Sequence, residues 1–375
     1  MLSMKKAGII TFHCADNFGA VLQVYALQQT IKEMEIDVEI IDFKPRAITS
    51  SYNHDSNIKF NFKKIGVART IKIVLTKTYN YSKIKKRLES YDTFRRNYLK
   101  VSDKKYYSNE ELLNDPPNYD FFITGSDQVW NPKFKKDIGN SYFLDFVKGN
   151  ARKISYSASI AEKVDKHLIK DYKTYINNFD YLSIREKSSL DFLKSLTNKD
   201  VAVTLDPTLL LVKEKWDRIV ENPMRGKKYI LVYDLQQNKE LIKLANKLSE
   251  EMGVSIISFS TNKDYNNRID SFQNKRPDEF LGLLKNAELV LTNSFHGTVF
   301  SVIYKKLFYV MPPKTRQSRL IDFLKDIKLE DRVVNNSIDI KNYKQEIDYN
   351  QVNNLLKIKR EESINFLKKS FGIND

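Results

Sequence analysis

The sequence predicts an α/β protein with two Rossmann-like domains that face each other across a cleft. Its 375 residues are too many for one core of ordinary size and fit two. In both halves, short apolar runs alternate with longer amphipathic segments, which is the pattern of parallel sheets with crossover helices. The 41% hydrophobic and 29% charged contents are typical of a globular chain.

The first unit of this pattern lies within residues 7–43. An apolar run, AGIITF, is followed by the loop HCADNFG, by the helical segment AVLQVYALQQTIKEM and by a second run, VEIIDF. This order predicts a strand, a helix and a parallel strand joined by a right-handed crossover. A Rossmann-like layer is therefore expected at the start of the chain.

The same logic sets the predicted domain bounds. The first domain, residues 1–212, continues with the strand-like runs YDFFITG, RKISYS, YLSI and VAVTL. The second, residues 213–345, contains the runs YILVY, VSIISF, ELVLT and LFYV, each separated from the next by a helical segment or a turn. Residues 346–375 are predicted to form a C-terminal helix that packs back on the first domain.

Basic residues exceed acidic ones by 63 to 47, a formal net charge of +16, which favours anionic partners. Many of them lie in residues 59–105, predicted to be a basic helical insertion in the first domain. This insertion is interpreted as a solvated surface or as a contact with an anionic membrane. No nucleic-acid partner is predicted, since no nucleic-acid-binding signature accompanies the charge. A cytoplasmic location is expected, with peripheral contact at the inner face of the membrane as an option.

Several chemistries lack their sequence signatures. The single cysteine, Cys14, rules out an internal disulfide and a cysteine-rich zinc site, and is expected to be a buried thiol. The GxGxxG, Walker, HExxH and EF-hand patterns are all absent. We therefore expect neither a bound cofactor nor a metal.

Polar residues that follow the predicted strands are the first candidates for a site. Ligands of open α/β sheets bind at the carboxyl ends of the strands. The residues in such places are Asp16, Asn17, Gly19, Ser126, Asp127, Ser157 and Arg185. Asp127 is interpreted either as a turn residue or as a general base. Trp130, close to it, would either stack on a sugar or fill the core.

A second group of candidates surrounds His296, in the stretch VLTNSFHGTVF. His296 lies where a strand ends and a helix begins, and the free N–H groups of a helix start attract anions. Gly297 would let a ligand approach the backbone, and Thr298 could cap the helix or donate to a ligand. Three cations follow within residues 314–319: Lys314, Arg316 and Arg319. The sequence thus predicts an anion site that also includes Arg185.

Six segments, in this order and spacing, resemble the polysaccharide pyruvyl transferase family. They are NFGAVLQVYALQQTI, ITGSDQVWNP, ISYSASIA, LSIREKSS, TLDPTLLL and LTNSFHGTVFSVIYKK, and the similarity extends over roughly residues 5–325. The resemblance implies a GT-B-like fold. It also implies transfer of pyruvate from phosphoenolpyruvate onto two hydroxyls of a sugar, as a ketal, in the biosynthesis of capsule, exopolysaccharide or cell-wall polymers.

The resemblance also implies roles for individual residues. Arg185 and His296 match residues expected to hold phosphoenolpyruvate, and one of Lys314, Arg316 and Arg319 matches a further cation. The chemistry needs a proton donor, for which His296 is a candidate, and a base, for which Asp127 or Asp16 is a candidate. Ala20 replaces an acid that some members have. The acceptor, a sugar or lipid-linked oligosaccharide, is expected to contact Asp16, Asn17, Gly19, Ser126, Asp127 and Trp130.

Two other functions fit the same residues. One is a GT-B glycosyltransferase that uses a nucleotide sugar, with His296 and the cations on its diphosphate. The other is a non-catalytic polysaccharide-binding protein. A nucleotide requirement would distinguish the first from a pyruvyltransferase, and the absence of any product would indicate the second.

Overall fold

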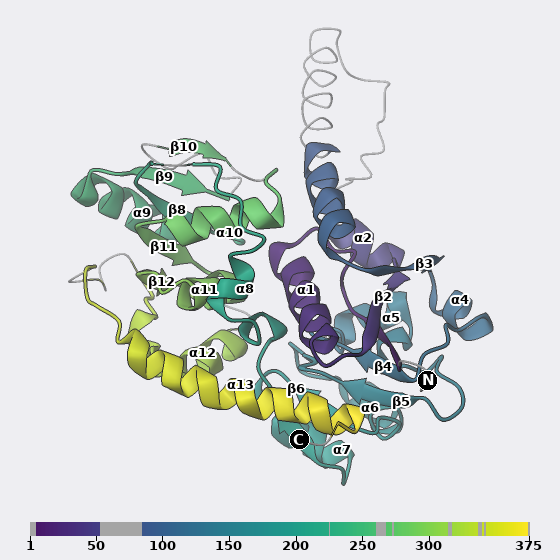
Figure 1. Cartoon of the computed structure of the whole chain (residues 1–375). Coiled ribbons are helices and arrows are strands. Elements are labelled where there is room, and N and C mark those ends of the chain that lie inside the picture. The colour runs from purple at the N-terminus through teal and green to yellow at the C-terminus, as the bar shows by residue number, and fades with distance from the viewer. Residues whose placement is uncertain are drawn as a thin grey trace, which may run out of the picture.

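The computed structural model describes residues 5–52, 85–224, 226–259, 268–271, 274–313, 317–336, 340 and 343–373. These residues form two α/β halves that lie side by side, each built on a five-stranded parallel sheet (Figure 1). Among them, no helix is both long and apolar enough to cross a membrane.

The sheet of the first half has the strand order β3-β2-β1-β4-β5. Its strands are β1 (Lys6–Ile10), β2 (Asp37–Phe43), β3 (Val101–Tyr106), β4 (Phe121–Thr124) and β5 (Arg152–Ser155). Side chains alternate between the two faces of a strand, so Ile9 and Ile10 of β1 are buried in two different apolar clusters. Both faces of the sheet are therefore covered, as parallel sheets require.

Two short strands continue from this sheet. β6 (Leu182–Ile184) and β7 (Val201–Val203) pair with each other, and single bridges join Ile154 to Tyr181 and Ala158 to Ile184. The helices of the first half are α1 (Phe18–Lys32), α2 (Arg46–Tyr52), α4 (Asn109–Asn114), α5 (Pro132–Ile138), α6 (Ile169–Ile176) and α7 (Leu190–Leu196), with short 3-10 turns at η2 (Ser141–Phe143), η3 (Lys166–Leu168), η4 (Lys187–Ser189) and η5 (Pro207–Leu209).

The second half repeats the arrangement with the strand order β10-β9-β8-β11-β12. Its strands are β8 (Tyr229–Tyr233), β9 (Ser255–Ser258), β10 (Arg268–Ser271), β11 (Leu289–Thr292) and β12 (Phe308–Val310). The chain enters it through α8 (Lys213–Trp216). Its helices are α9 (Lys239–Met252), α10 (Pro277–Asn286), α11 (Phe295–Ile303) and α12 (Ser318–Asp326), with the 3-10 turn η6 (Glu330–Arg332).

In both sheets the strand order reverses beside the first strand, between β1 and β4 and between β8 and β11. Such switch points are where open α/β sheets bind their ligands, at the carboxyl ends of the strands. The loops that begin at residues 11, 125 and 293 leave the sheets at these points. The fold and the sequence pattern therefore indicate the same loops as candidate ligand sites.

Helix α1 lies against both halves, and 13 of its 15 residues are buried. Phe18, its first residue, stacks on Phe280 of α10 with ring centroids 4.5 Å apart. On another side it stacks on Tyr91, at 5.5 Å. Stacked aromatic pairs add to the burial of apolar area, so Phe18 is a firm contact between the halves.

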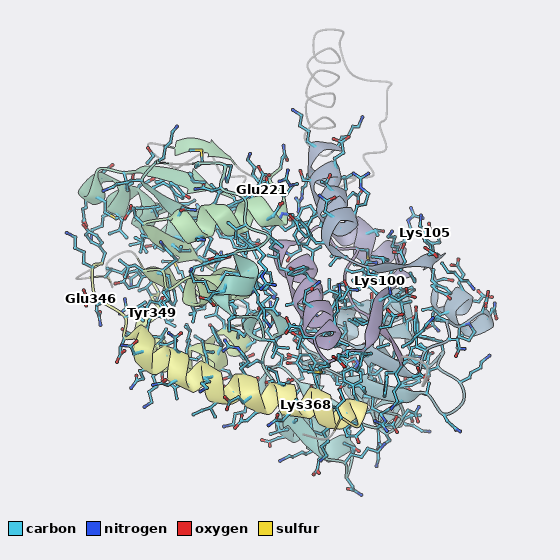
Figure 2. The ribbon with its side chains drawn as sticks, in the orientation of Figure 1. Lys100, Lys105, Glu221, Glu346, Tyr349 and Lys368 are labelled. Carbon is cyan, nitrogen blue, oxygen red and sulfur yellow. The ribbon has the colours of Figure 1, made fainter. Side chains whose placement is uncertain are left out.

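The C-terminal helix α13 (Tyr349–Phe371) runs from the second half across to the first, and Tyr349 and Lys368 mark its two ends in Figure 2. Near its end, Arg152 Nη1 donates to the carbonyl of Ser370 (2.8 Å), and Phe371 packs edge-on against Phe121 of β4. Gly372 ends the helix in the left-handed conformation. The helix thereby links the two sheets on one side of the molecule.

The region predicted as a basic helical insertion has a mixed structure. Residues 59–84 lie outside the described part of the chain. Residues 85–98 are helical, but residues 101–106 form the edge strand β3 rather than helix. The helix turns Arg95 inward, where its guanidinium donates to the carbonyl of His13 (2.9 Å) and to Asp16 Oδ1 (2.6 Å). Part of the basic charge therefore supports the loop after β1 instead of facing solvent.

Candidate active site at the junction of the two halves

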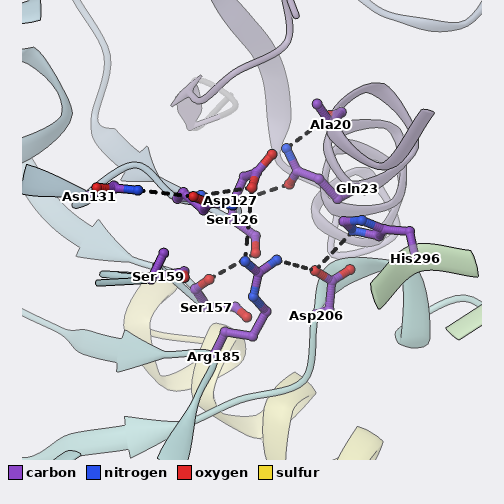
Figure 3. Close-up of polar contacts among 12 residues, drawn as sticks. Ala20, Gln23, Ser126, Asp127, Asn131, Ser157, Ser159, Arg185, Asp206 and His296 are labelled. Atoms are coloured by element: carbon purple, nitrogen blue, oxygen red, sulfur yellow. Dashed lines mark hydrogen bonds and ion pairs between the residues drawn. The ribbon is translucent and has the colours of Figure 1, made fainter. Parts of the chain in front are cut away.

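Arg185 lies directly after β6 and is 8% exposed. Its Nη1 donates to Asp206 Oδ2 at 2.8 Å (Figure 3). Nη2 is 3.9 Å from Asp127 Oδ1, and Nε is 3.9 Å from Glu186 Oε2. Three carboxylates thus surround one buried guanidinium.

His296 comes from the other half, in the first turn of α11. The helix begins there because the side chain of Ser294 accepts a hydrogen bond from the N–H of Gly297 (3.3 Å), a typical N-cap. The imidazole Nε2 is 3.4 Å from Asp206 Oδ2. Arg185 and His296, from different halves, therefore contact the same carboxylate oxygen (Figure 3).

Asp206 is the residue that joins them, and it was not among the site residues predicted from the sequence. Its other oxygen, Oδ1, accepts hydrogen bonds from Thr208 N (3.0 Å) and Oγ1 (2.6 Å). Burial alone would raise the pKa of Asp206, but the charges of His296 and Arg185 and the bonds from Thr208 hold it well below its ordinary value. Asp206 is therefore a buried anion shared by Arg185 and His296.

Several polar atoms of this group have no hydrogen-bond partner among the described residues. They are Nε and Nη2 of Arg185, Oε2 of Glu186 and Nε2 of His296, whose contact with Asp206 is an ion pair. A buried polar atom without a partner costs about 1–3 kcal/mol. Three of the four are nitrogens that can donate to an anion. The arrangement therefore suits a ligand with several negative oxygens.

Arg319 of α12 adds a further cation from the second half. Its guanidinium lies 5.7 Å from the ring of Phe295, whose ring also faces Arg185 at 5.1 Å. Arg185, Asp206, Phe295 and Arg319 line one small cavity of about 50 Å³. Of the three predicted cations after His296, Arg319 thus lies beside Arg185, while Lys314 and Arg316 are outside the described residues.

Asp127 is near Arg185 but is also a turn residue. It has a positive φ of 78°, and its Oδ1 accepts from the N–H of Gln128 (2.8 Å). Both interpretations made from the sequence, a turn residue and a general base, are compatible with this position.

Ser126 and Trp130, predicted to contact the acceptor, are buried and make their contacts within the protein. Ser126 donates through N–H to Gln23 Oε1 (3.2 Å) and through Oγ to the carbonyl of Ser157 (2.8 Å). Trp130 is 1% exposed, stacks on Phe143 and donates to the carbonyl of Tyr142. The prediction that they face a sugar is wrong, because the strand end turns both side chains inward.

Residues of the loop after β1 and of the start of α1 also make contacts that stabilise the fold. Asn17 caps α1 by accepting from the N–H of Ala20 (3.2 Å), and Asp16 is paired with Arg95. Burial raises the pKa of Asp16, although Arg95 opposes the rise. A Cβ on Gly19 would lie 2.0 Å from Nδ1 of His296, so this glycine leaves room for the imidazole instead of for a sugar. These residues were predicted to contact the acceptor, whereas their observed contacts are with the protein itself.

Gly297 and Thr298 likewise face the protein. A Cβ on Gly297 would lie 2.5 Å from Thr292 Oγ1, so the glycine allows α11 to pack on β11. Thr298 is fully buried, and its hydroxyl donates to the carbonyl of Ser294 (3.0 Å). The prediction that these two residues meet the ligand directly is corrected, since close packing explains both.

In the described part of the chain, no group of three His, Cys, Asp or Glu side chains has a geometry that could hold a metal ion. Cys14 is buried, and burial raises the pKa of its thiol to about 12. The anion site formed by Arg185, Asp206 and His296, with Arg319 beside it, is the chemical feature that the structure assembles from both halves.

Comparison with known proteins agrees with this architecture. No curated protein sequence matches the chain. Among the solved structures that align with nearly all of it are the S. aureus MnaA–UDP complex (TM-score 0.53, 12% identity, 99% of this chain and 98% of the other) and a candidate UDP-N-acetylglucosamine 2-epimerase from Listeria monocytogenes (TM-score 0.50, 11% identity, 98% and 91%). At such low identity they show the fold alone, which is GT-B-like.

The family profile described as polysaccharide pyruvyl transferase matches residues 17–314. This range includes α1, the strand ends of both sheets, Arg185, Asp206 and His296. The chain belongs to the polysaccharide pyruvyl transferase family.

Proposed function

We propose that this protein transfers the pyruvate of phosphoenolpyruvate onto two hydroxyls of a sugar as a ketal, releasing phosphate. The supporting observation is the contact of Arg185 and His296, from different halves, with one buried carboxylate of Asp206. Family membership makes the protein a transferase. The polymer to which the sugar belongs, capsule, exopolysaccharide or cell wall, is part of the proposal.

Phosphoenolpyruvate, the pyruvate donor, would be bound by the side-chain nitrogens of Arg185 and His296 that have no hydrogen-bond partner among the described residues. Phosphoenolpyruvate has a carboxylate and a phosphate, and both suit a guanidinium fork. Nη2 of Arg185 carries two such N–H groups, and His296 Nε2 offers a third. Arg319 would add positive charge beside them. Each hydrogen bond to a charged group is worth about 1.5–3 kcal/mol, which is enough for a specific site.

The bond changes of the proposed reaction balance without a cofactor. Two sugar O–H bonds break and two C–O bonds form at the central carbon of phosphoenolpyruvate, while the bond from this carbon to the phosphate oxygen breaks. One released proton converts the methylene carbon to a methyl group, and the other leaves with phosphate. His296 is the proposed proton donor, because its neighbour Asp206 stabilises the protonated imidazole. Asp127, 3.9 Å from Arg185, is the proposed base.

The fold alone would also suit a glycosyltransferase, so the experiment must separate the two reactions. Phosphate release would be measured with phosphoenolpyruvate and a panel of free and lipid-linked oligosaccharides, with and without nucleotide sugars. We expect release that needs phosphoenolpyruvate and a sugar but no nucleotide. Product formation that requires a nucleotide sugar would contradict the proposal, and so would the absence of release with every acceptor.

A further inference from the structure

A cavity of about 530 Å³ opens beside Glu186, between the two halves. Ligand sites for small molecules have volumes of about 300–1,000 Å³. Most of its wall belongs to the first half, but Ser318, the first residue of α12, closes it from the second. Its lining mixes apolar side chains (Ile160, Val164, Ile169, Phe192) with polar ones (Glu162, Lys163, Lys166, Glu186, Ser188, Ser189).

Glu186 shapes this cavity. Its Oε1 accepts three hydrogen bonds, from Ser159 Oγ (2.7 Å), Ile160 N (3.0 Å) and Ala161 N (3.1 Å). These bonds fix the turn that forms one wall. The side chain is buried at 3% exposure, so this oxygen is fully used by the protein.

The second oxygen of Glu186 has no hydrogen-bond partner among the described residues, and neither has Nε of Arg185, 3.9 Å away. One atom can only accept and the other can only donate. A hydroxyl group does both, so one sugar hydroxyl placed between them would satisfy the pair. Because Arg185 and Glu186 are consecutive, such a hydroxyl would also lie beside the anion site.

Three of the residues first expected to bind the acceptor are engaged elsewhere. Trp130 is in the core, Ser126 is hydrogen-bonded within the first half, and Gly19 packs under His296. We propose that the cavity beside Glu186 binds the acceptor sugar, with Glu186 Oε2 accepting a hydrogen bond from a reacting hydroxyl. The assignment rests on the proposed function, since it names the second substrate site of that reaction.

Photoaffinity labelling tests the location without requiring any reaction. The probes are gluco-, galacto- and mannopyranosides, with their 2-acetamido forms, that carry an alkyl diazirine on the aglycone. Peptide mapping by mass spectrometry should find labels within residues 160–169 and 186–192, and excess unlabelled glycoside should remove them. Labels confined to other segments, or no competed label with any probe, would overturn the assignment.

Kinetics with the acceptor that the wild type converts give a second test. Ser189→Tyr places a ring in the cavity and should raise the KM of the sugar about 10-fold or more, leaving the KM of phosphoenolpyruvate unchanged. Ser195→Tyr is the matched control: Ser195 is exposed on α7, the helix that begins directly after Ser189, and is not in the lining. We expect wild-type kinetics from it. An unchanged sugar KM in Ser189→Tyr would refute the assignment.

Glu186→Gln tests the role of the carboxylate. The amide oxygen can still hold the turn at residues 159–161, while the amide NH₂ replaces the accepting oxygen. Its kcat/KM for the sugar should fall about 10-fold or more while Tm stays near that of the wild type. Wild-type kcat/KM would contradict the role of Oε2. If the wild type forms no ketal, the proposed function fails, and the labelling still decides whether the cavity binds sugar.

Discussion

Nη1 of Arg185 and Oδ2 of Asp206 lie 2.8 Å apart, and both side chains are buried where the two halves meet. Asp206 is also in ion-pair contact with His296 of the other half. The pair therefore places the guanidinium and connects it with the imidazole. Four predictions follow from this group and its surroundings.

Arg185→Lys keeps the charge but loses the planar fork. Because lysine cannot bond Asp206 and a substrate anion in the same geometry, kcat/KM for phosphoenolpyruvate should fall about 100-fold or more. Steady-state kinetics would show this, with circular dichroism as the check on folding. Arg218→Lys, on a surface position away from the site, is the control. Equal kcat/KM for Arg185→Lys and wild type would exclude a role for the fork.

Asp206→Asn should make stability less dependent on acid pH. The pKa of Asp206 lies below its ordinary value, so its ionised form stabilises the fold above the pKa of the unfolded chain, about 3.9. That contribution is lost as pH falls through the folded-state pKa. The difference in free energy of unfolding between wild type and variant should therefore shrink as the pH falls below about 3.9. Urea titrations at several pH values measure it, and a difference that grows in acid would contradict the assignment.

Gly19→Ala should displace His296, because the added Cβ would lie 2.0 Å from Nδ1. Overpacking of this kind costs about 1–3 kcal/mol, although alanine is the better helix former. A double-mutant cycle with His296→Ala separates the two effects. We expect the destabilisation by Gly19→Ala to vanish when His296 is already alanine. An equal loss of stability in both backgrounds would show that the contact is not the cause.

Cys14 should be unreactive in the folded protein. Burial raises its pKa to about 12, and the thiolate is the reactive form. Its reaction with Ellman's reagent at pH 8 should be at least about 100-fold slower than in denaturant. Rapid labelling of the native protein would disprove the burial of this thiol.

The repeated units were predictable because their periodicity is strong. The apolar runs at β1, β8 and β11, each followed by a helical pattern, predict the two parallel sheets. The edge strand β3 was missed because its sequence, VSDKKY, is mostly exposed and polar and lies within a basic stretch. Strands at the edge of a sheet often carry charged side chains, so the alternation of apolar and polar residues that predicts a strand is weak there.

The site was partly predictable for a related reason. Arg185 and His296 follow strands, where ligands of α/β proteins bind, so their positions made them candidates and the family resemblance supported them. Asp206 precedes a proline and looks like an ordinary turn, and its role depends on a residue 90 positions away in the chain. For Trp130 and Gly297, the local pattern could not say which way each faces, because that is set by tertiary packing.

The most direct test of the central claim is mass spectrometry of free and lipid-linked oligosaccharides incubated with phosphoenolpyruvate and the protein. The account predicts a mass gain equal to one pyruvate ketal on at least one acceptor, lost in His296→Ala and Arg185→Ala. Acceptors that remain unmodified across a wide panel, or that gain a hexose only when a nucleotide sugar is added, would contradict it.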